Sequence, residues 1–192
     1  MTAEAMPIWT IGHSTRSANE FLAVLAAYDI ELVIDVRRFP GSRRLPQFDS
    51  ETLERSLATR DIAYRWLAEL GGRRKPDPLS NNLAWRHPAF RAYADHVNSE
   101  EFAGGLFELL MLAEGLRTVT MCAEVLWWRC HRRIIADVLT SVGIDVVHIQ
   151  TESMATHHVL APPARLVAGQ LSYRAAKRAS LTPTRPSRER ES

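Results

Sequence analysis

The sequence predicts an α/β domain built around a mostly parallel β-sheet, and three observations lead to that prediction. Short apolar runs alternate along the chain with longer segments of helical periodicity, which is typical of βαβ units. The length of 192 residues suits one domain. Hydrophobic residues make up 46% of the chain and charged residues 24%, so the composition is that of a folded globular protein and excludes a disordered one.

The first half of the chain alternates strand and helix signals. Ile8 to Ile11 form a buried apolar run that ends at Gly12, and the apolar residues of segment 17–28 recur at the three- and four-residue spacing of a helix. A second apolar run, 32–34, leads into Asp35. Prolines and a glycine then break a polar connection over 37–49. We expect a helix that starts near residue 50 and a weak third strand over 62–66.

The second half repeats the alternation after a loop over 71–82 that is rich in Gly, Pro, Asn and Arg. Periodicity predicts helices over 88–97, 101–114 and 127–141, with strands over 118–122 and 144–149. A short helix over 166–176 is expected to close the domain. The expected boundaries are therefore one α/β domain over 7–175 and a disordered, Arg- and Pro-rich tail over 176–192.

Charge and cysteine content narrow the function classes. The net charge is only +2, below the surplus of a dedicated nucleic-acid binder. Among the basic residues, however, only Lys75 and Lys177 are lysines. This arginine bias either serves anion recognition or reflects a GC-rich genome. Two cysteines cannot form a disulfide framework, and no apolar run approaches the length of a membrane span. We therefore expect a cytoplasmic protein with free thiols and no membrane contact.

Polar residues gather where predicted strands end. Open α/β sheets bind ligands beyond the carboxyl ends of their strands. Here four such segments, 12–16, 35–43, 70–74 and 122–132, carry His, Asp, Arg, Cys and Glu side chains. Each segment alone has a structural explanation, such as a tight turn or a helix cap. Four independent loops have no common structural reason to place these residues at one edge, so the sequence predicts a site there.

The reactive group at this edge has three interpretations. A cysteine could be a nucleophile with His131 or His13 as its base, or Glu124 could be the nucleophile or base while arginines hold an anion. Alternatively, Cys122, Cys130, His131 and His13 could bind zinc. The usual zinc-knuckle spacing is absent, and adjacent residues in the first turns of a helix diverge by about 100°. The sequence therefore favours no metal and no cofactor.

The same segments carry a family resemblance that covers roughly residues 8–150. The chain resembles domain-of-unknown-function family 488, whose signatures match Thr10–Ser14; Asp35, Val36, Arg37, Pro40, Ser42, Arg43 and Phe48; Tyr64, Leu67, Leu70, Gly71, Gly72 and Arg74; and Cys122, Glu124, Cys130, His131 and Arg132. The resemblance implies a single three-layer, Rossmann-like α/β domain whose motif residues form one site. It names no substrate.

We expect an enzyme, a hydrolase or transferase, that acts on a small anionic substrate of nucleotide or nucleobase type. The expected catalytic residues are His13, Asp35, Glu124, Cys130 and His131. The expected ligand-binding residues are Gly12, Ser14, Arg37, Ser42, Arg43, Tyr64, Gly71, Gly72, Arg74, Cys122 and Arg132. The alternative is a nucleic-acid-binding or accessory module whose arginine-rich loops contact phosphates.

Overall fold

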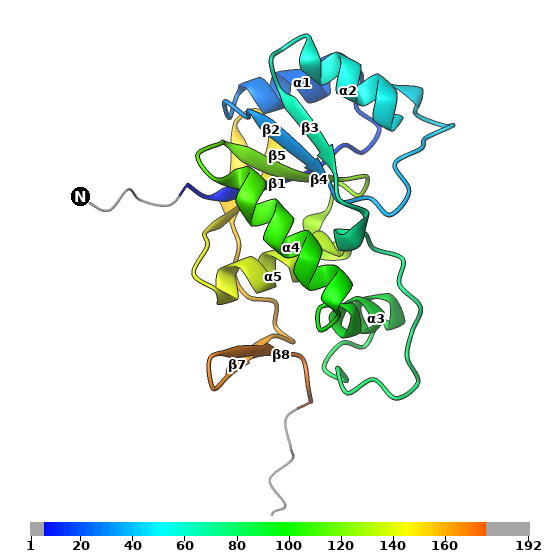
Figure 1. The fold of residues 1–192 in the computed structure, drawn as a ribbon, viewed down its shortest axis with the longest axis vertical. Coiled ribbons are helices and arrows are strands. Elements are labelled where there is room, and N and C mark those ends of the chain that lie inside the picture. Colours follow the sequence, from blue (N-terminus) through cyan, green and yellow to red (C-terminus); the bar gives the residue numbers. More distant parts are fainter. Residues whose placement is uncertain (1–5, 176–192) are drawn as a thin grey trace, which may run out of the picture.

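A computed structural model describes residues 6–175 of the protein, and the tail expected over 176–192 lies outside the described residues. The centre of the fold is a six-stranded sheet in the order β3-β2-β4-β1-β5-β6 (Figure 1). Its strands are β1 (Ile8–Gly12), β2 (Leu32–Asp35), β3 (Ala63–Trp66), β4 (Thr118–Cys122), β5 (Val146–Thr151) and β6 (Met154–His157). The first five strands pair in parallel, and β6 is antiparallel to β5. The predicted α/β class with a mostly parallel sheet is confirmed.

Helices cover both faces of this sheet, which makes a three-layer, Rossmann-like arrangement (Figure 1). The helices are α1 (Ala18–Ala26), α2 (Ser50–Ala58), α3 (Pro88–His96), α4 (Glu100–Ala113) and α5 (Arg132–Ser141). Successive strand residues point to opposite faces. Accordingly, Val33 packs with the apolar side chains of α1 and α2, whereas its neighbours Leu32 and Ile34 pack with those of α3, α4 and α5.

Two helices begin at the caps that their sequences favour. Ser17 accepts a hydrogen bond from the backbone N–H of Glu20, while the Glu20 carboxylate accepts one from the backbone N–H of Ser17. This reciprocal capping box satisfies two N–H groups at the start of α1. Ser99 caps α4 in the simpler way, by accepting from the N–H of Phe102.

The helix predicted over 166–176 is wrong. The chain there forms a two-stranded hairpin, β7 (Arg165–Val167) with β8 (Gln170–Ser172). Its two turn residues, Ala168 and Gly169, have φ values of +50° and +78°, as a tight two-residue hairpin turn requires. Leu166 and Val167 are exposed, so this segment has no helical face to bury. The strand β6 was also not predicted, because its residues are largely exposed and lack an apolar run.

The start of the helix predicted over 127–141 is also wrong. A 3₁₀ turn occupies Trp127–Arg129, Cys130 has an extended backbone with φ −115° and ψ 152°, and α5 starts only at Arg132. The ring of Trp127 lies flat on the ring of His148, with their centroids 4.0 Å apart. This stacking fixes the backbone ahead of α5 and overrides its helical periodicity.

Among residues 6–175, no helix has the length and apolar character needed to span a membrane.

Candidate active-site cleft

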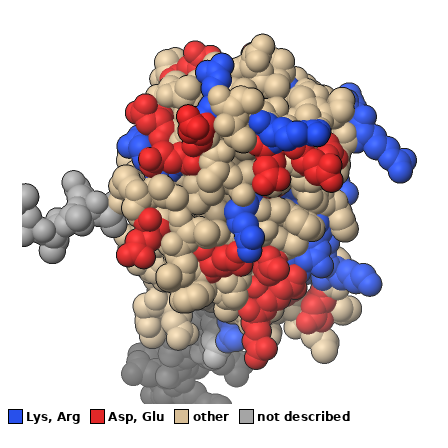
Figure 2. Space-filling model, turned by 45° about the horizontal axis from the view of Figure 1, so that its top comes forward, with Lys and Arg blue, Asp and Glu red and all other residues tan. Residues whose placement is uncertain are grey.

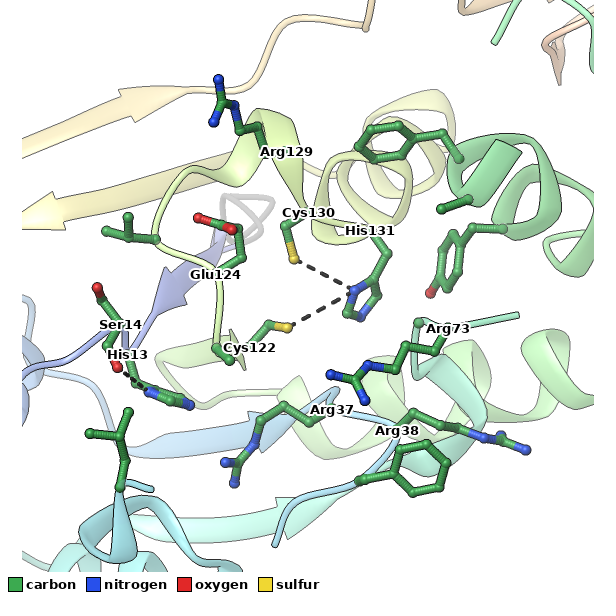
Figure 3. Close-up of a pocket in the computed structure, with 18 of the residues that line it drawn as sticks. His13, Ser14, Arg37, Arg38, Arg73, Cys122, Glu124, Arg129, Cys130 and His131 are labelled. Atoms are coloured by element: carbon green, nitrogen blue, oxygen red, sulfur yellow. Dashed lines mark hydrogen bonds between the residues drawn. The ribbon is translucent and has the colours of Figure 1, made fainter. Parts of the chain in front are cut away.

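A cleft of about 1010 Å³ opens beyond the carboxyl ends of β1, β2 and β4. Its walls come from the loops after these strands, from Gly72 and Arg73, and from the start of α3 (Figure 3). The predicted site residues that line it are His13, Ser14, Arg37, Gly72, Cys122, Glu124, Cys130 and His131. The topology therefore brings half of the predicted site together, at the edge where the sequence placed it.

The loops after β1 and β4 are held against each other by backbone contacts. The N–H of His13 donates to the carbonyl of Cys122 at 2.9 Å, and the N–H of Ser14 donates to the carbonyl of Ala123 at 3.0 Å. Gly12 lies so close to this second loop that a Cβ atom there would stand 2.0 Å from the carbonyl oxygen of Glu124. Only glycine allows this approach, so Gly12 shapes the cleft without lining it.

His13 presents an unprotonated nitrogen at the cleft. Its ring is buried and stacked on Phe48 with centroids 4.0 Å apart, and its Nδ1 is 2.8 Å from the carbonyl oxygen of Ser14. Nδ1 must therefore donate, which leaves Nε2 as an acceptor, and Nε2 has no partner among the described residues. Burial lowers the pKa of His13 to about 4, and the nearby Arg37 acts in the same direction. The ring is consequently neutral at pH 7.

Two thiols and one imidazole nitrogen meet at the other side of the cleft. The Nδ1 of His131 is 3.5 Å from the Sγ of Cys130 and 4.0 Å from the Sγ of Cys122 (Figure 3). Both cysteines are buried free thiols. The Nε2 of His131 is 2.9 Å from the carbonyl oxygen of Val36, so Nε2 carries the proton and Nδ1 has its lone pair directed at the sulfur atoms.

The two thiols differ in how readily they lose a proton. The hydrogen bond to Cys130 and burial together raise the pKa of Cys122 well above its usual range. Burial by itself would raise the pKa of Cys130, but the hydrogen bond from Cys122 and the positive charge of Arg132 outweigh it and lower that pKa well below its usual range. The first negative charge of the pair therefore resides on Cys130.

Glu124 is exposed at the mouth of the cleft, and a buried arginine supports its backbone. Its carboxylate accepts a hydrogen bond from the N–H of Leu126 at 3.1 Å. Its carbonyl oxygen accepts one from the guanidinium of Arg132, a fully buried side chain that also donates to Thr10 Oγ1 at 3.1 Å. Arg132, predicted to bind ligand, therefore lies under the loop and not in the cleft.

Asp35 and Arg37, both buried, form a hydrogen-bonded brace with the half-buried Tyr64. Nε and Nη2 of Arg37 donate to the Asp35 carboxylate at 2.5–3.0 Å, its Nη1 donates to the carbonyl of Phe48, and the Tyr64 hydroxyl donates to Asp35 at 2.7 Å. The polar atoms of Arg37 are thus committed inside the protein. Figure 3 shows its guanidinium turned away from the thiols. Asp35 and Tyr64 do not line the cleft.

Other predicted arginine and glycine residues also have structural roles or lie elsewhere. Arg74 donates to the carbonyls of residues 68, 69 and 71 and pairs with Glu101 at 2.7 Å. Gly71 packs tightly against the backbone of Arg38. Ser42 accepts a hydrogen bond from the N–H of Leu45, and Arg43 is exposed on the same loop. None of Ser42, Arg43, Gly71 and Arg74 lines the cleft.

Two arginines of the cleft lie in segments that the sequence analysis singled out but were not among its expected catalytic or ligand-binding residues. Arg73 and Arg129 line the cleft, are exposed, and make no side-chain hydrogen bond or ion pair with any described residue. Arg73 has a left-handed backbone with φ +57°. Its position beside two glycines was a signal that could have been used. The aromatic residues Phe39, His87, Phe90 and Tyr93 also line the cleft, and no motif pointed to them.

A buried polar chain, also unpredicted, connects this site to the carboxyl-terminal segment. Asp137 Oδ1 is 2.9 Å from Nε2 of His158, whose Nδ1 is 2.9 Å from Nε2 of His148, whose Nδ1 is 2.7 Å from Thr10 Oγ1. With one proton on each ring, every donor meets an acceptor: Thr10 donates to His148 and accepts from Arg132. The chain therefore ends at the arginine that supports the Glu124 loop.

The comparison with known proteins agrees with the resemblance seen in the sequence. The family model described as "Domain of unknown function DUF488" matches residues 17–139. That range includes the whole of the brace, the thiol cluster and Glu124. Among curated proteins and among solved structures, no significant match is found.

Proposed function

Since the chain belongs to the family described as Domain of unknown function DUF488, a description that names no reaction, we propose its function from the cleft itself. The protein is an enzyme that acts on a small anionic substrate of nucleotide or nucleobase type. The reaction class is hydrolysis or group transfer. The observation that carries the proposal is one cleft that joins unpaired arginines to a cluster of reactive thiol, imidazole and carboxylate groups.

The arginine groups support an anionic ligand. Arg73 and Arg129 line the cleft from different segments and have no internal partner among the described residues. A planar guanidinium matches phosphate or carboxylate oxygens in a bidentate way. Arg38 also lines the cleft, although Glu101 and the carbonyl of Ala68 occupy part of its hydrogen-bonding capacity. Within residues 6–175, the cleft arginines without a side-chain partner are therefore Arg73 and Arg129, and these would hold the anion.

The size and the aromatic lining support a nucleotide or nucleobase. Ligand sites typically measure about 300–1,000 Å³, so this cleft is at the upper end of that range. Phe39 is 66% exposed, which makes its ring available to a planar ligand, and Phe90 lines the same cleft. The unpartnered Nε2 of His13 would accept a hydrogen bond from the ligand. Glu124, exposed at the mouth, would exchange the proton that hydrolysis or transfer requires.

A thermal-shift screen with nucleotides, nucleobases and sugar phosphates tests the proposal. Occupancy at a hundred times the dissociation constant stabilises the folded state by about 2.7 kcal/mol, which raises the melting temperature measurably. Arg73→Ala and Arg129→Ala should each weaken binding of the ligand found. Arg43→Ala is the matched control, because Arg43 is equally exposed but lies outside the cleft. No shift with any compound, in folded protein, would contradict the proposal.

The alternative, a nucleic-acid-binding module, is supported by the exposed Arg43, Arg44 and Arg73. On the face that Figure 2 shows, however, basic side chains are interspersed with acidic ones and form no continuous basic surface. A module that neutralises several phosphates loses orders of magnitude in affinity between about 50 and 200 mM salt. Titration of a fluorescent oligonucleotide at both salt concentrations separates the two functions.

A further inference from the structure

We propose that Cys122, Cys130 and His131 bind a thiophilic divalent metal ion, with Zn²⁺ the best match, and leave one coordination position open to the cleft. The donor atoms are the two Sγ atoms and Nδ1 of His131, and all three lie within 4.8 Å of one another. This inference does not depend on the proposed function, because metal binding can be measured without any substrate.

The distances in this cluster are those of a tetrahedral zinc site. Bond lengths of about 2.3 Å to sulfur and about 2.0–2.1 Å to nitrogen place a sulfur and a nitrogen ligand about 3.6 Å apart at a tetrahedral angle. The observed distances from Nδ1 of His131 are 3.5 Å to Cys130 and 4.0 Å to Cys122. The two nitrogen–sulfur distances therefore differ from the tetrahedral value by only a few tenths of an ångström.

The tautomer of His131 is already that of a metal ligand. Ligating histidines commonly donate their second ring N–H to a backbone carbonyl, which fixes the ring and keeps the ligating nitrogen unprotonated. Here Nε2 of His131 is 2.9 Å from the Val36 carbonyl oxygen. Gly72 packs against the ring, where a Cβ atom would stand 2.8 Å from Nδ1. The imidazole is thus held in place by groups that are independent of the thiols.

The two cysteine side chains have few polar partners outside this cluster. Both are buried, and their side-chain polar contacts among described residues are to each other, to His131 and, for Cys122, to the backbone N–H of Glu124. The backbone of Cys130 is extended ahead of α5, so Cys130 and His131 do not diverge as successive residues of a helix would. Of the two sequence arguments against zinc, the divergence of adjacent residues assumed a helix that the structure does not contain at Cys130; the absence of zinc-knuckle spacing stands.

The fourth position faces the cleft. Three protein ligands with one open position are the arrangement of catalytic zinc sites, whereas structural sites use four protein ligands. Among described residues, no other His, Cys, Asp or Glu joins the cluster within the same distance. In Figure 3 the sulfur atoms lie between His131 and the side of the cleft that carries Glu124 and His13. A water molecule or an anionic group of a ligand can therefore occupy this position.

Metal analysis of the tag-free full chain, purified without chelator, is the first test. We expect about one zinc per chain by elemental mass spectrometry. After removal of the metal, added Co²⁺ should bind at one equivalent and produce the thiolate-to-cobalt charge-transfer band. Zinc should also protect two thiols from a thiol reagent that modifies both in the metal-free protein. Protein that is purified without metal and that takes up neither Zn²⁺ nor Co²⁺ would overturn the proposal.

Variants localise the site. Cys122→Ser, Cys130→Ser and His131→Ala should each lower zinc affinity by more than tenfold in competition with a chromophoric chelator. His87→Ala is the control, because His87 lines the same cleft but lies outside the cluster. The zinc affinity of this variant should equal that of the wild-type protein. Should a cysteine variant fail to fold, the cobalt spectrum of the wild-type chain still decides. A disulfide between the cysteines that forms readily in air and excludes zinc would instead identify a redox pair.

Discussion

At the scale of single residues, a substitution at Glu124 should affect turnover without affecting the stability of the fold. The side chain is exposed and makes one hydrogen bond, to the N–H of Leu126, which glutamine can also accept. Glu124→Gln should therefore change the free energy of unfolding by less than about 1 kcal/mol. Glutamine cannot take up a proton, so turnover of the substrate found in the thermal-shift screen should fall by about 10²–10⁴-fold. Denaturant melts and initial rates of the two proteins provide the check. Equal turnover would remove Glu124 from the mechanism.

Gly12 is the residue where the geometry of the site is most sensitive to one methyl group. A Cβ at Gly12 would stand 2.0 Å from the Glu124 carbonyl oxygen, so two backbone segments must separate. We expect Gly12→Ala to destabilise the fold by at least the roughly 1–3 kcal/mol of an overpacked core. In the helix α4, Gly104 is exposed with nothing within 4 Å of an added Cβ, so Gly104→Ala should stabilise by about 0.5–1 kcal/mol. Urea melts of both variants measure the contrast, and similar effects at both positions would contradict it.

At the scale of elements, hydrophobic periodicity predicted the strands and helices that face the core. It failed where an element is exposed and where contacts between residues far apart in the sequence determine the backbone conformation. The first five strands and the helices α1 to α4 are near their expected places, since all of them except the largely exposed β3 bury an apolar face. The hairpin over 165–172 lies on the surface, so no periodic pattern marked it. The late start of α5 depends on the stacking of Trp127 on His148, a partner 21 residues ahead that a local pattern cannot contain.

The same reasoning explains the partial prediction of the site. Strand ends marked the correct edge of the sheet, but sequence alone could not separate a side chain in the cleft from one that braces it. Asp35, Arg37 and Tyr64 satisfy one another inside the protein, which only the paired register of β2 and β3 reveals. Arg73 and Arg129 line the cleft, and no described residue forms an ion pair with either of them. Which arginine finds an internal partner is a property of the tertiary structure.

The polar chain that begins at Thr10 gives an element-scale prediction. Valine has nearly the shape of threonine but no hydroxyl, so Thr10→Val leaves a ring nitrogen of His148 and a donor of Arg132 without their partner. A buried polar group left unpaired costs about 1–3 kcal/mol. Thr120→Val is the matched control, since Thr120 is equally buried and makes only one long hydrogen bond of 3.4 Å. In thermal melts, Thr120→Val should unfold at a clearly higher temperature than Thr10→Val. Equal melting temperatures would show that this chain of hydrogen bonds contributes nothing to stability.

At the scale of the whole molecule, buried neutral histidines make stability depend on pH. Burial lowers the pKa of His13 to about 4 and that of His148 to about 3, and also lowers that of His96. In the unfolded chain each titrates near 6.5, so below that pH the unfolded state binds more protons than the folded state. The free energy of unfolding should therefore fall as the pH drops from 6.5, and for His13 the loss continues to about pH 4.

Between pH 6.5 and 4.5, the contribution of the histidines to the free energy of unfolding can be measured separately from that of the carboxylates. Glu20 and Glu101 also have lowered pKa values, but their contribution is lost only below about 4.5, where the unfolded carboxylates take up protons. Urea melts in chelator should show the free energy of unfolding falling by roughly 1 kcal/mol per pH unit for each of His13 and His148, whose pKa values in the folded protein lie below this window. His13→Gln removes one titrating group, so its slope in this window should be shallower by about that amount. An unchanged slope would mean that the ring of His13 is accessible to protons in the folded protein.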